Sequence, residues 1–187
     1  DFVEVSIDAC FVDGEFRGHM VAAWTEPFEI APHVMVERVQ LEGCYRKDNW
    51  YVAGEIQMGI AEHWGANIRG KYQRTGQTGK WSVEGTVDQR EDITLGEVRL
   101  HSGHAEVKVV DGTFEPVTAH QEVAWRTLVG TLDGTYNVET GKVNAHGEAH
   151  LEGPLSVGDS GITFEEATLD AKVEDNTVQR LARKRIK

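Results

Sequence analysis

The chain has 187 residues, of which 31 are Asp or Glu and 19 are Lys or Arg, so its formal net charge is −12. This acidic balance argues against binding to nucleic acid and against docking on anionic lipid, because both use clustered basic side chains. Hydrophobic residues make up 40% of the chain, which excludes a disordered segment. The length fits a single domain over 1–187, and a start at Asp1 predicts a fragment of a longer polypeptide.

Apolar and polar residues alternate along most of the chain, a pattern typical of strands with one buried and one solvated face. The alternation is clearest at 50–60, 81–88 and 143–151. The final stretch, Val178–Lys187, has a different pattern and predicts either a short helix or a basic tail. No run approaches the roughly 18 consecutive apolar residues of a transmembrane helix, so none is expected.

Turn residues divide the alternating segments at regular intervals. Residues that accept a positive φ predict tight turns at Asp13-Gly14, Asp48-Asn49, Thr75–Gly79, Asp111-Gly112, Thr140-Gly141 and Asp175-Asn176. Looser connections are expected at 26–32, 61–65, 90–96, 120–125 and 153–161. The tight turns recur about every 32 residues, which favours six repeated hairpins. We therefore predict an all-β antiparallel meander of about 12 strands.

A set of glycines lies within the predicted strands, on their apolar face. These are Gly18, Gly43, Gly54, Gly70, Gly85 and Gly147. Glycine inside a strand weakens it, so a recurring row indicates close approach of neighbouring groups or sharp bending. Aromatic residues cluster nearer the tight turns, where their rings would lean over the glycines. These positions predict a strongly curved sheet or a closed barrel.

The apolar face needs a cover, and no amphipathic helix is long enough to supply one. The sheet could close as a barrel, fold over as a two-layer sandwich, or meet other segments of the same polypeptide or another copy. A membrane barrel is disfavoured because a lipid-facing surface is continuously apolar, whereas Gly, Ala and charged residues interrupt this one.

Sequence motifs for catalysis are missing, since the chain has neither a G-x-S-x-G elbow nor a Walker loop. We therefore expect no enzyme activity and no cofactor. The best metal candidate is His146, Glu148 and His150, which alternate along one strand face and could hold Zn²⁺ or Cu²⁺ with a ligand from a neighbouring strand. A solvated His/Glu face without metal is the alternative. His101 and His104 are three residues apart, which predicts opposite faces.

Aromatic residues suggest two kinds of ligand site. A pocket for a small apolar ligand in a soluble barrel would be lined by Tyr45, Trp50, Tyr72 and Trp81. Three tryptophans near the looser connections either stack on carbohydrate or cap the open end of the sheet, and these are Trp24, Trp64 and Trp125.

The two cysteines, Cys10 and Cys44, are expected on the polar faces of the first and third strands. Two strand spacings separate them by about 9.5 Å, which exceeds the reach of a disulfide. We predict that both are unbridged.

Three motifs carry a resemblance to a known family. They are G-T-L-x-G-x-Y-x-V-x-x-G-K at Gly130–Lys142, G-x-A-x-L at Gly147–Leu151 and L-x-A-x-V-E-x-N at Leu169–Asn176. Together they resemble the glycine-rich β-repeat scaffold of large bacterial secreted toxins, notably cargo of extracellular contractile injection systems. The resemblance covers about a third of the chain, and this chain has more Trp and His and fewer Ser and Thr than such scaffolds. It implies a spacer, shell or carrier segment of a secreted or injected bacterial effector.

The leading functional hypothesis is thus a non-enzymatic β-repeat scaffold that spaces or shelters another segment. A soluble barrel that binds a small apolar ligand or carbohydrate is the second. A metal-dependent enzyme that uses His146, Glu148 and His150 is the third.

Overall fold

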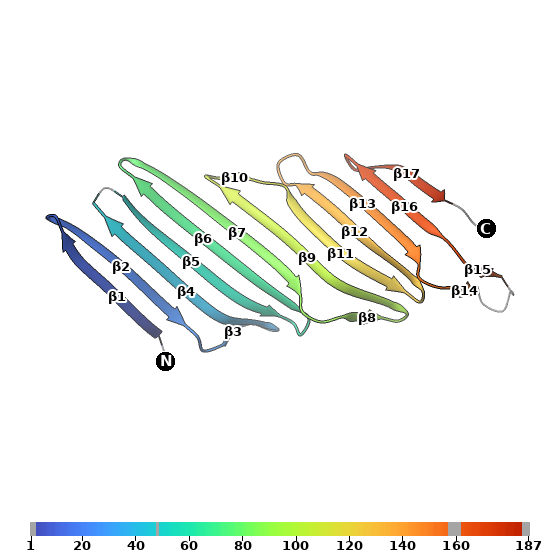
Figure 1. The fold of residues 1–187 in the computed structure, drawn as a ribbon, viewed down its shortest axis with the longest axis horizontal. Helices are drawn as coiled ribbons and strands as arrows, with labels where there is room; N and C mark the ends of the chain where they lie inside the picture. The colour runs from blue at the N-terminus through green and yellow to red at the C-terminus, as the bar shows by residue number, and fades with distance from the viewer. Residues whose placement is uncertain (1–2, 48, 157–161, 185–187) are drawn as a thin grey trace. The chain divides into compact units, whose positions relative to one another are not determined.

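The computed structural model describes residues 3–47, 49–156 and 162–184. All regular secondary structure in these residues is β-strand, and no helix among them is long and apolar enough to cross a membrane. Neighbouring strands pair antiparallel in sequence order (Figure 1), which confirms the all-β meander. The chain forms two compact units, Asp1–Val87 with Val107–Glu115 and Asp88–Glu106 with Pro116–Lys187, and each is described by itself.

The first unit is a sheet with the hydrogen-bonded order β1-β2-β4-β5-β6-β7, and the short β3 pairs with the beginning of β4. Its strands are β1 (Val3–Val12), β2 (Glu15–Trp24), β3 (Phe28–Ala31), β4 (Val34–Arg46), β5 (Asn49–Ile60), β6 (Trp64–Thr75), most of β7 (Thr78–Gln89) and β10 (Thr113–Phe114). The last residues of β9 (Val98–Val110) also belong to this unit and pair with β10.

The second unit has the order β9-β11-β12-β13-β16-β17. Its strands are β8 (Ile93–Leu95), most of β9 (Val98–Val110), β11 (Val117–Trp125), β12 (Leu128–Asn137), β13 (Lys142–Leu151), β14 (Leu155–Ser156), β15 (Thr163–Phe164), β16 (Thr168–Glu174) and β17 (Thr177–Lys184). Strand β8 pairs with β9, and β14 and β15 form a separate two-stranded sheet.

The twelve strands of these two orders match the predicted six hairpins. Asp13 and Gly14 have φ angles of 53° and 75°, as in the type I′ turns that join twisted strands. Asp111 and Gly112, with φ angles of 49° and 88°, make a second turn of this kind. The turn predicted at Asp48-Asn49 includes Asp48, which lies outside the described residues.

Two local predictions are wrong. The looser connection expected at 120–125 is part of β11, and the turn follows at 126–127. The helix considered for Val178–Lys187 is instead strand β17 as far as Lys184, paired antiparallel with β16. A helix this short has little stability of its own in water, whereas pairing with β16 satisfies the backbone of one strand edge.

The two faces of the first unit separate apolar from polar residues as predicted. Residues opposite one another in register share a face, and one row of such partners is Ile7, Met20, Gly43, Val52 and Tyr72. Neighbouring side chains lie over the glycines of this face. A Cβ added at Gly18 would meet the Phe16 ring at 3.2 Å, and one added at Gly54 would meet Leu41 Cδ2 at 3.0 Å.

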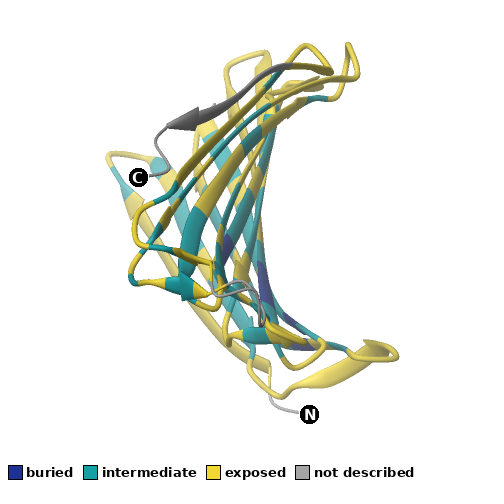
Figure 2. Ribbon diagram, turned by 90° about the vertical axis from the view of Figure 1, so that its right-hand side faces the viewer, coloured by how far each residue is buried: buried dark blue, intermediate teal, exposed yellow. Residues whose placement is uncertain are grey.

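Most hydrophobic side chains of the described residues are exposed or half-buried. Of the described hydrophobic side chains only Val36 and Ala66 are buried, and Figure 2 shows few dark segments among exposed and half-buried ribbon. In the described pairing β1 is hydrogen-bonded to β2, and β17 is hydrogen-bonded to β16.

Candidate functional site

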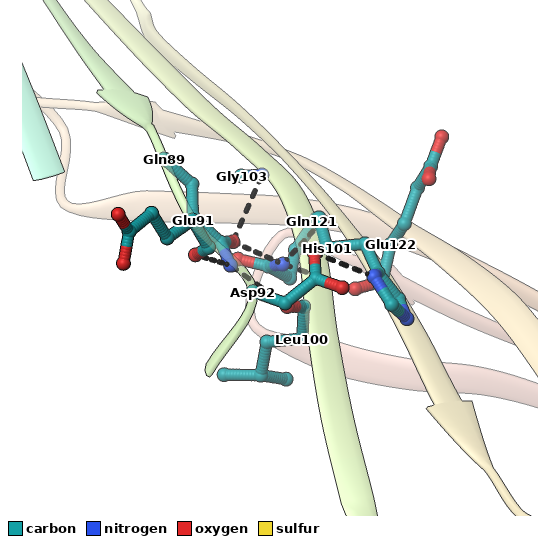
Figure 3. Close-up of polar contacts among 8 residues, drawn as sticks. All are labelled: Gln89, Glu91, Asp92, Leu100, His101, Gly103, Gln121 and Glu122. Atoms are coloured by element: carbon teal, nitrogen blue, oxygen red, sulfur yellow. Dashed lines mark hydrogen bonds and ion pairs between the residues drawn. The ribbon is translucent and has the colours of Figure 1, made fainter. Parts of the chain in front are cut away.

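A β-bulge in β9 lies among several polar contacts of the second unit. Residues 102 and 103 of β9 lie opposite the single residue Gln121 of β11, and Ser102 has a φ of 48°. Two glutamine side chains form hydrogen bonds with backbone groups at the bulge (Figure 3). Gln121 Nε2 donates to the His101 carbonyl at 2.7 Å, while Gln89 donates to the Leu100 carbonyl at 2.7 Å and accepts from the Gly103 amide at 3.1 Å.

The bulge corrects the prediction that His101 and His104 lie on opposite faces. His104 is opposite His120, and His101 is opposite Glu122, two residues further along the same strand. Because residues two apart on a strand share a face, both histidines face the same side. The extra residue in the bulge cancels the change of face that a three-residue spacing otherwise causes.

Histidine and carboxylate side chains alternate across this face. His104 Nδ1 lies 2.6 Å from Asp88, and His120 Nδ1 lies 2.6 Å from Asp133 on β12. His101 Nδ1 likewise lies 2.7 Å from Asp92. The register places these groups in one row across the strands, which runs His104, His120, Asp133, His146 and Lys172. A depression of about 680 Å³ lies over the row.

The predicted metal ligands are only partly brought together. His146 Nε2 lies 3.5 Å from Glu148 Oε1 and 3.3 Å from Asp170 Oδ1 on β16. The ligand atoms of these three exposed residues all lie within 4.8 Å of one another. His150 is two residues beyond Glu148 on β13, where it is opposite Thr168, and it does not belong to this group.

Asp170 is the ligand candidate that the sequence analysis missed. Its place on the polar face follows from the alternation in β16, but its partner depends on register. In that register Glu148 is directly opposite Asp170. The connection between β13 and β16 contains β14 and β15, so local patterns do not predict this pairing.

The predicted aromatic ligand residues lie on the apolar face of the first unit, and three of the four form a connected group. Tyr45 and Trp50 are opposite one another in the β4–β5 pair, and the Trp50 and Tyr72 ring centroids are 5.0 Å apart. Tyr45 and Trp50 line an apolar depression of about 490 Å³. Trp81 lies on β7 and is hydrogen-bonded to Asp111 of the β9–β10 turn. The Trp81 amide donates to Asp111 Oδ1 at 2.8 Å, and the Trp81 carbonyl accepts from the Asp111 amide at 2.9 Å.

The tryptophans near the looser connections contact neighbouring groups at the strand ends. Trp24 meets Phe28 edge to face at 5.8 Å, and the Trp125 indole donates to Glu97 at 3.2 Å beneath the Arg126 guanidinium. These are contacts expected of rings that cap strand ends. Carbohydrate binding by these residues stays a prediction.

On the polar face of the first unit, one carboxylate oxygen of Glu42 contacts both Tyr51 and His19. Tyr51 donates to Glu42 Oε1 at 2.5 Å, and His19 Nε2 lies 3.0 Å from the same atom. These contacts, with the Tyr51 bond as the larger cause, hold the pKa of Glu42 below its ordinary value. The bond from Tyr51 to Glu42 also raises the pKa of Tyr51 to about 12. Cys10 and Cys44 are both free, as predicted.

Comparison with known proteins adds no relative. The chain matches no protein-family model, no curated protein and no solved structure. The apolar face of the first unit can bury apolar area, and the polar face of the second unit presents imidazole and carboxylate groups that can bind a cation or exchange protons.

Proposed function

We propose that the chain is a non-enzymatic structural scaffold whose apolar sheet face is covered by another polypeptide surface. The observation that carries the proposal is the set of exposed apolar side chains on the sheet face of the first unit. A sheet with one apolar face is stable when that face is packed against another layer.

The exposed apolar residues are contiguous in the first unit. Ile7 is 67% exposed, Leu41 47% and Val52 46%, and all three belong to the apolar face shared by β1, β4 and β5. Monomeric proteins rarely expose a contiguous apolar patch of more than a few hundred Å². An interface is the ordinary explanation for such a patch.

For this chain on its own, the covering surface that we propose is a second copy. Obligate dimers bury about 2,000–5,000 Å² in largely apolar interfaces, and an exposed apolar sheet face offers a surface of this kind. Within a longer polypeptide, another segment could cover the same face. The resemblance of Gly130–Lys142 to β-repeat scaffolds supports placing the chain in a secreted or injected bacterial effector. There it would space or shelter another segment of the effector.

Self-association tests the proposal, and a pair of variants tests the face involved. Ile7→Lys puts a charge on the apolar face, and Ser6→Lys puts the same charge on the opposite face of the same strand. Because Ile7 is already largely exposed, neither change should prevent folding. We expect wild type and Ser6→Lys to sediment as dimers or larger species and Ile7→Lys to shift towards monomer. A wild-type chain that is monomeric and binds no apolar dye would contradict the proposal.

A second function is favoured by the aromatic depression at Tyr45 and Trp50. A cavity of about 490 Å³ with apolar lining is within the size range of small-ligand sites. Native mass spectrometry of the purified chain would detect a co-purified apolar ligand, and its loss in Trp50→Ala would assign the site. Repeated absence of any bound ligand would count against this function.

A further inference from the structure

His146 meets its carboxylates differently from the other paired histidines of the same face. His104 and His120 each approach one Asp oxygen with Nδ1 at 2.6 Å, a distance typical of a charge-assisted hydrogen bond, and the other nitrogen of His120, Nε2, lies 3.9 Å from Glu122. His146 Nε2 lies instead between two carboxylate oxygens, at 3.5 Å from Glu148 and 3.3 Å from Asp170. The contact with Asp170 is a long hydrogen bond, and the contact with Glu148 is at ion-pair distance.

The same distances match the spacing of ligands around a tetrahedral metal ion. Zinc binds imidazole nitrogen and carboxylate oxygen at about 2.0–2.2 Å, so ligands at tetrahedral angles lie about 3.3–3.6 Å apart. The three ligand atoms lie within 4.8 Å of one another. This separation is close enough for all three side chains to contact one ion.

Charge gives an independent reason for a cation at this place. Glu148 and Asp170 are directly opposite one another in the β13–β16 register. Like charges in a directly opposed cross-strand pair destabilise the sheet. A divalent ion between them would convert this repulsion into attraction to a shared charge.

We propose that His146 Nε2, Glu148 and Asp170 form a zinc site that joins β13 to β16, with water at the fourth position. The two strands are separated in the sequence by 152–167, so ligands from both would restrain a long connection and favour their pairing. The site lies on the polar face and does not depend on the proposed function of the apolar face.

Zinc titration of the chelator-treated full chain, followed by calorimetry and thermal unfolding, tests the site. We expect wild type to bind zinc and to gain Tm with it. His146→Gln and Asp170→Asn should each weaken that binding by about tenfold or more and lose the gain in Tm. The matched control is His104→Gln, which removes a paired histidine from the same face and should bind zinc as wild type does.

Two results would overturn the proposal. One is a wild-type chain that binds no zinc. The other is zinc binding with the same stoichiometry and affinity in His146→Gln as in wild type, which would assign the ion to other surface histidines or to the free thiols.

Discussion

Gln121 Nε2 donates a hydrogen bond to Gln89 Oε1 at 3.1 Å, so two side chains far apart in the sequence meet at the bulge of β9. Gln121 also donates to the His101 carbonyl. Replacement by leucine would remove the side-chain donor of the part-buried His101 carbonyl. We expect Gln121→Leu to lower the free energy of unfolding by about 1–3 kcal/mol in urea titrations. The exposed Gln73→Leu on β6 serves as the control and should change stability little.

A double-mutant cycle with Gln89→Leu separates a shared network from two independent bonds. Because the two amides contact one another, the double variant should lose less stability than the sum of the single variants. Strict additivity would show that the two glutamines act separately at the bulge.

Gly130 of β12 has no room for a side chain. A Cβ at this position would lie 2.5 Å from the Glu148 carbonyl oxygen and 2.7 Å from Ala149 Cβ on β13. Gly130→Ala should therefore force these strands apart and lower the free energy of unfolding by about 1–3 kcal/mol. Gly134→Ala is the control on the same strand, because its Cβ would lie 3.7 Å from the nearest atom. Equal stability of the two variants in urea would refute this steric explanation.

The sequence predicts the repeated hairpins because alternation and turn residues are local signals. Asp13-Gly14 and Asp111-Gly112 show this, since each pair needs a positive φ that aspartate and glycine accept. The bulge at Ser102 is not visible in this way, because a serine within a polar run has no distinct pattern. Its consequence, the shared face of His101 and His104, follows only from the pairing of β9 with β11.

The bond between Tyr51 and Glu42 predicts how stability depends on pH. The pKa of Tyr51 is raised from 10.0 to about 12, so its contribution is fully present below pH 10 and is lost as pH rises through about 12. Wild type should therefore lose unfolding free energy over this range more steeply than Tyr51→Phe. Urea titrations at several alkaline pH values measure the difference, with Tyr45→Phe on the opposite face as control.

Glu42 gives the complementary prediction at acid pH. Its pKa is lowered, so its contribution is present above the ordinary carboxylate pKa and is lost as pH falls through the lowered value. Glu42→Gln should make the acid limb of the stability profile shallower. An unchanged acid limb in this variant would show that other carboxylates cause the loss.

Only part of the candidate metal site can be predicted from the sequence. His146 and Glu148 are two residues apart on one strand, so their shared face follows from alternation alone. Asp170 joins them only through the register of β13 with β16, and that register is set across the inserted strands β14 and β15. Alternation places His150 on the same face, but the register puts it opposite Thr168, two residues beyond Glu148.

Covering of the apolar face is tested most directly by thiol labelling at two adjacent positions of β5. With Cys10 and Cys44 replaced by serine, Val52→Cys places a thiol on the apolar face and Ala53→Cys places one on the opposite face. We predict that the thiol at position 52 is labelled more slowly as protein concentration rises, while the thiol at position 53 is labelled at a constant rate. Labelling of both thiols at rates independent of concentration would contradict the account.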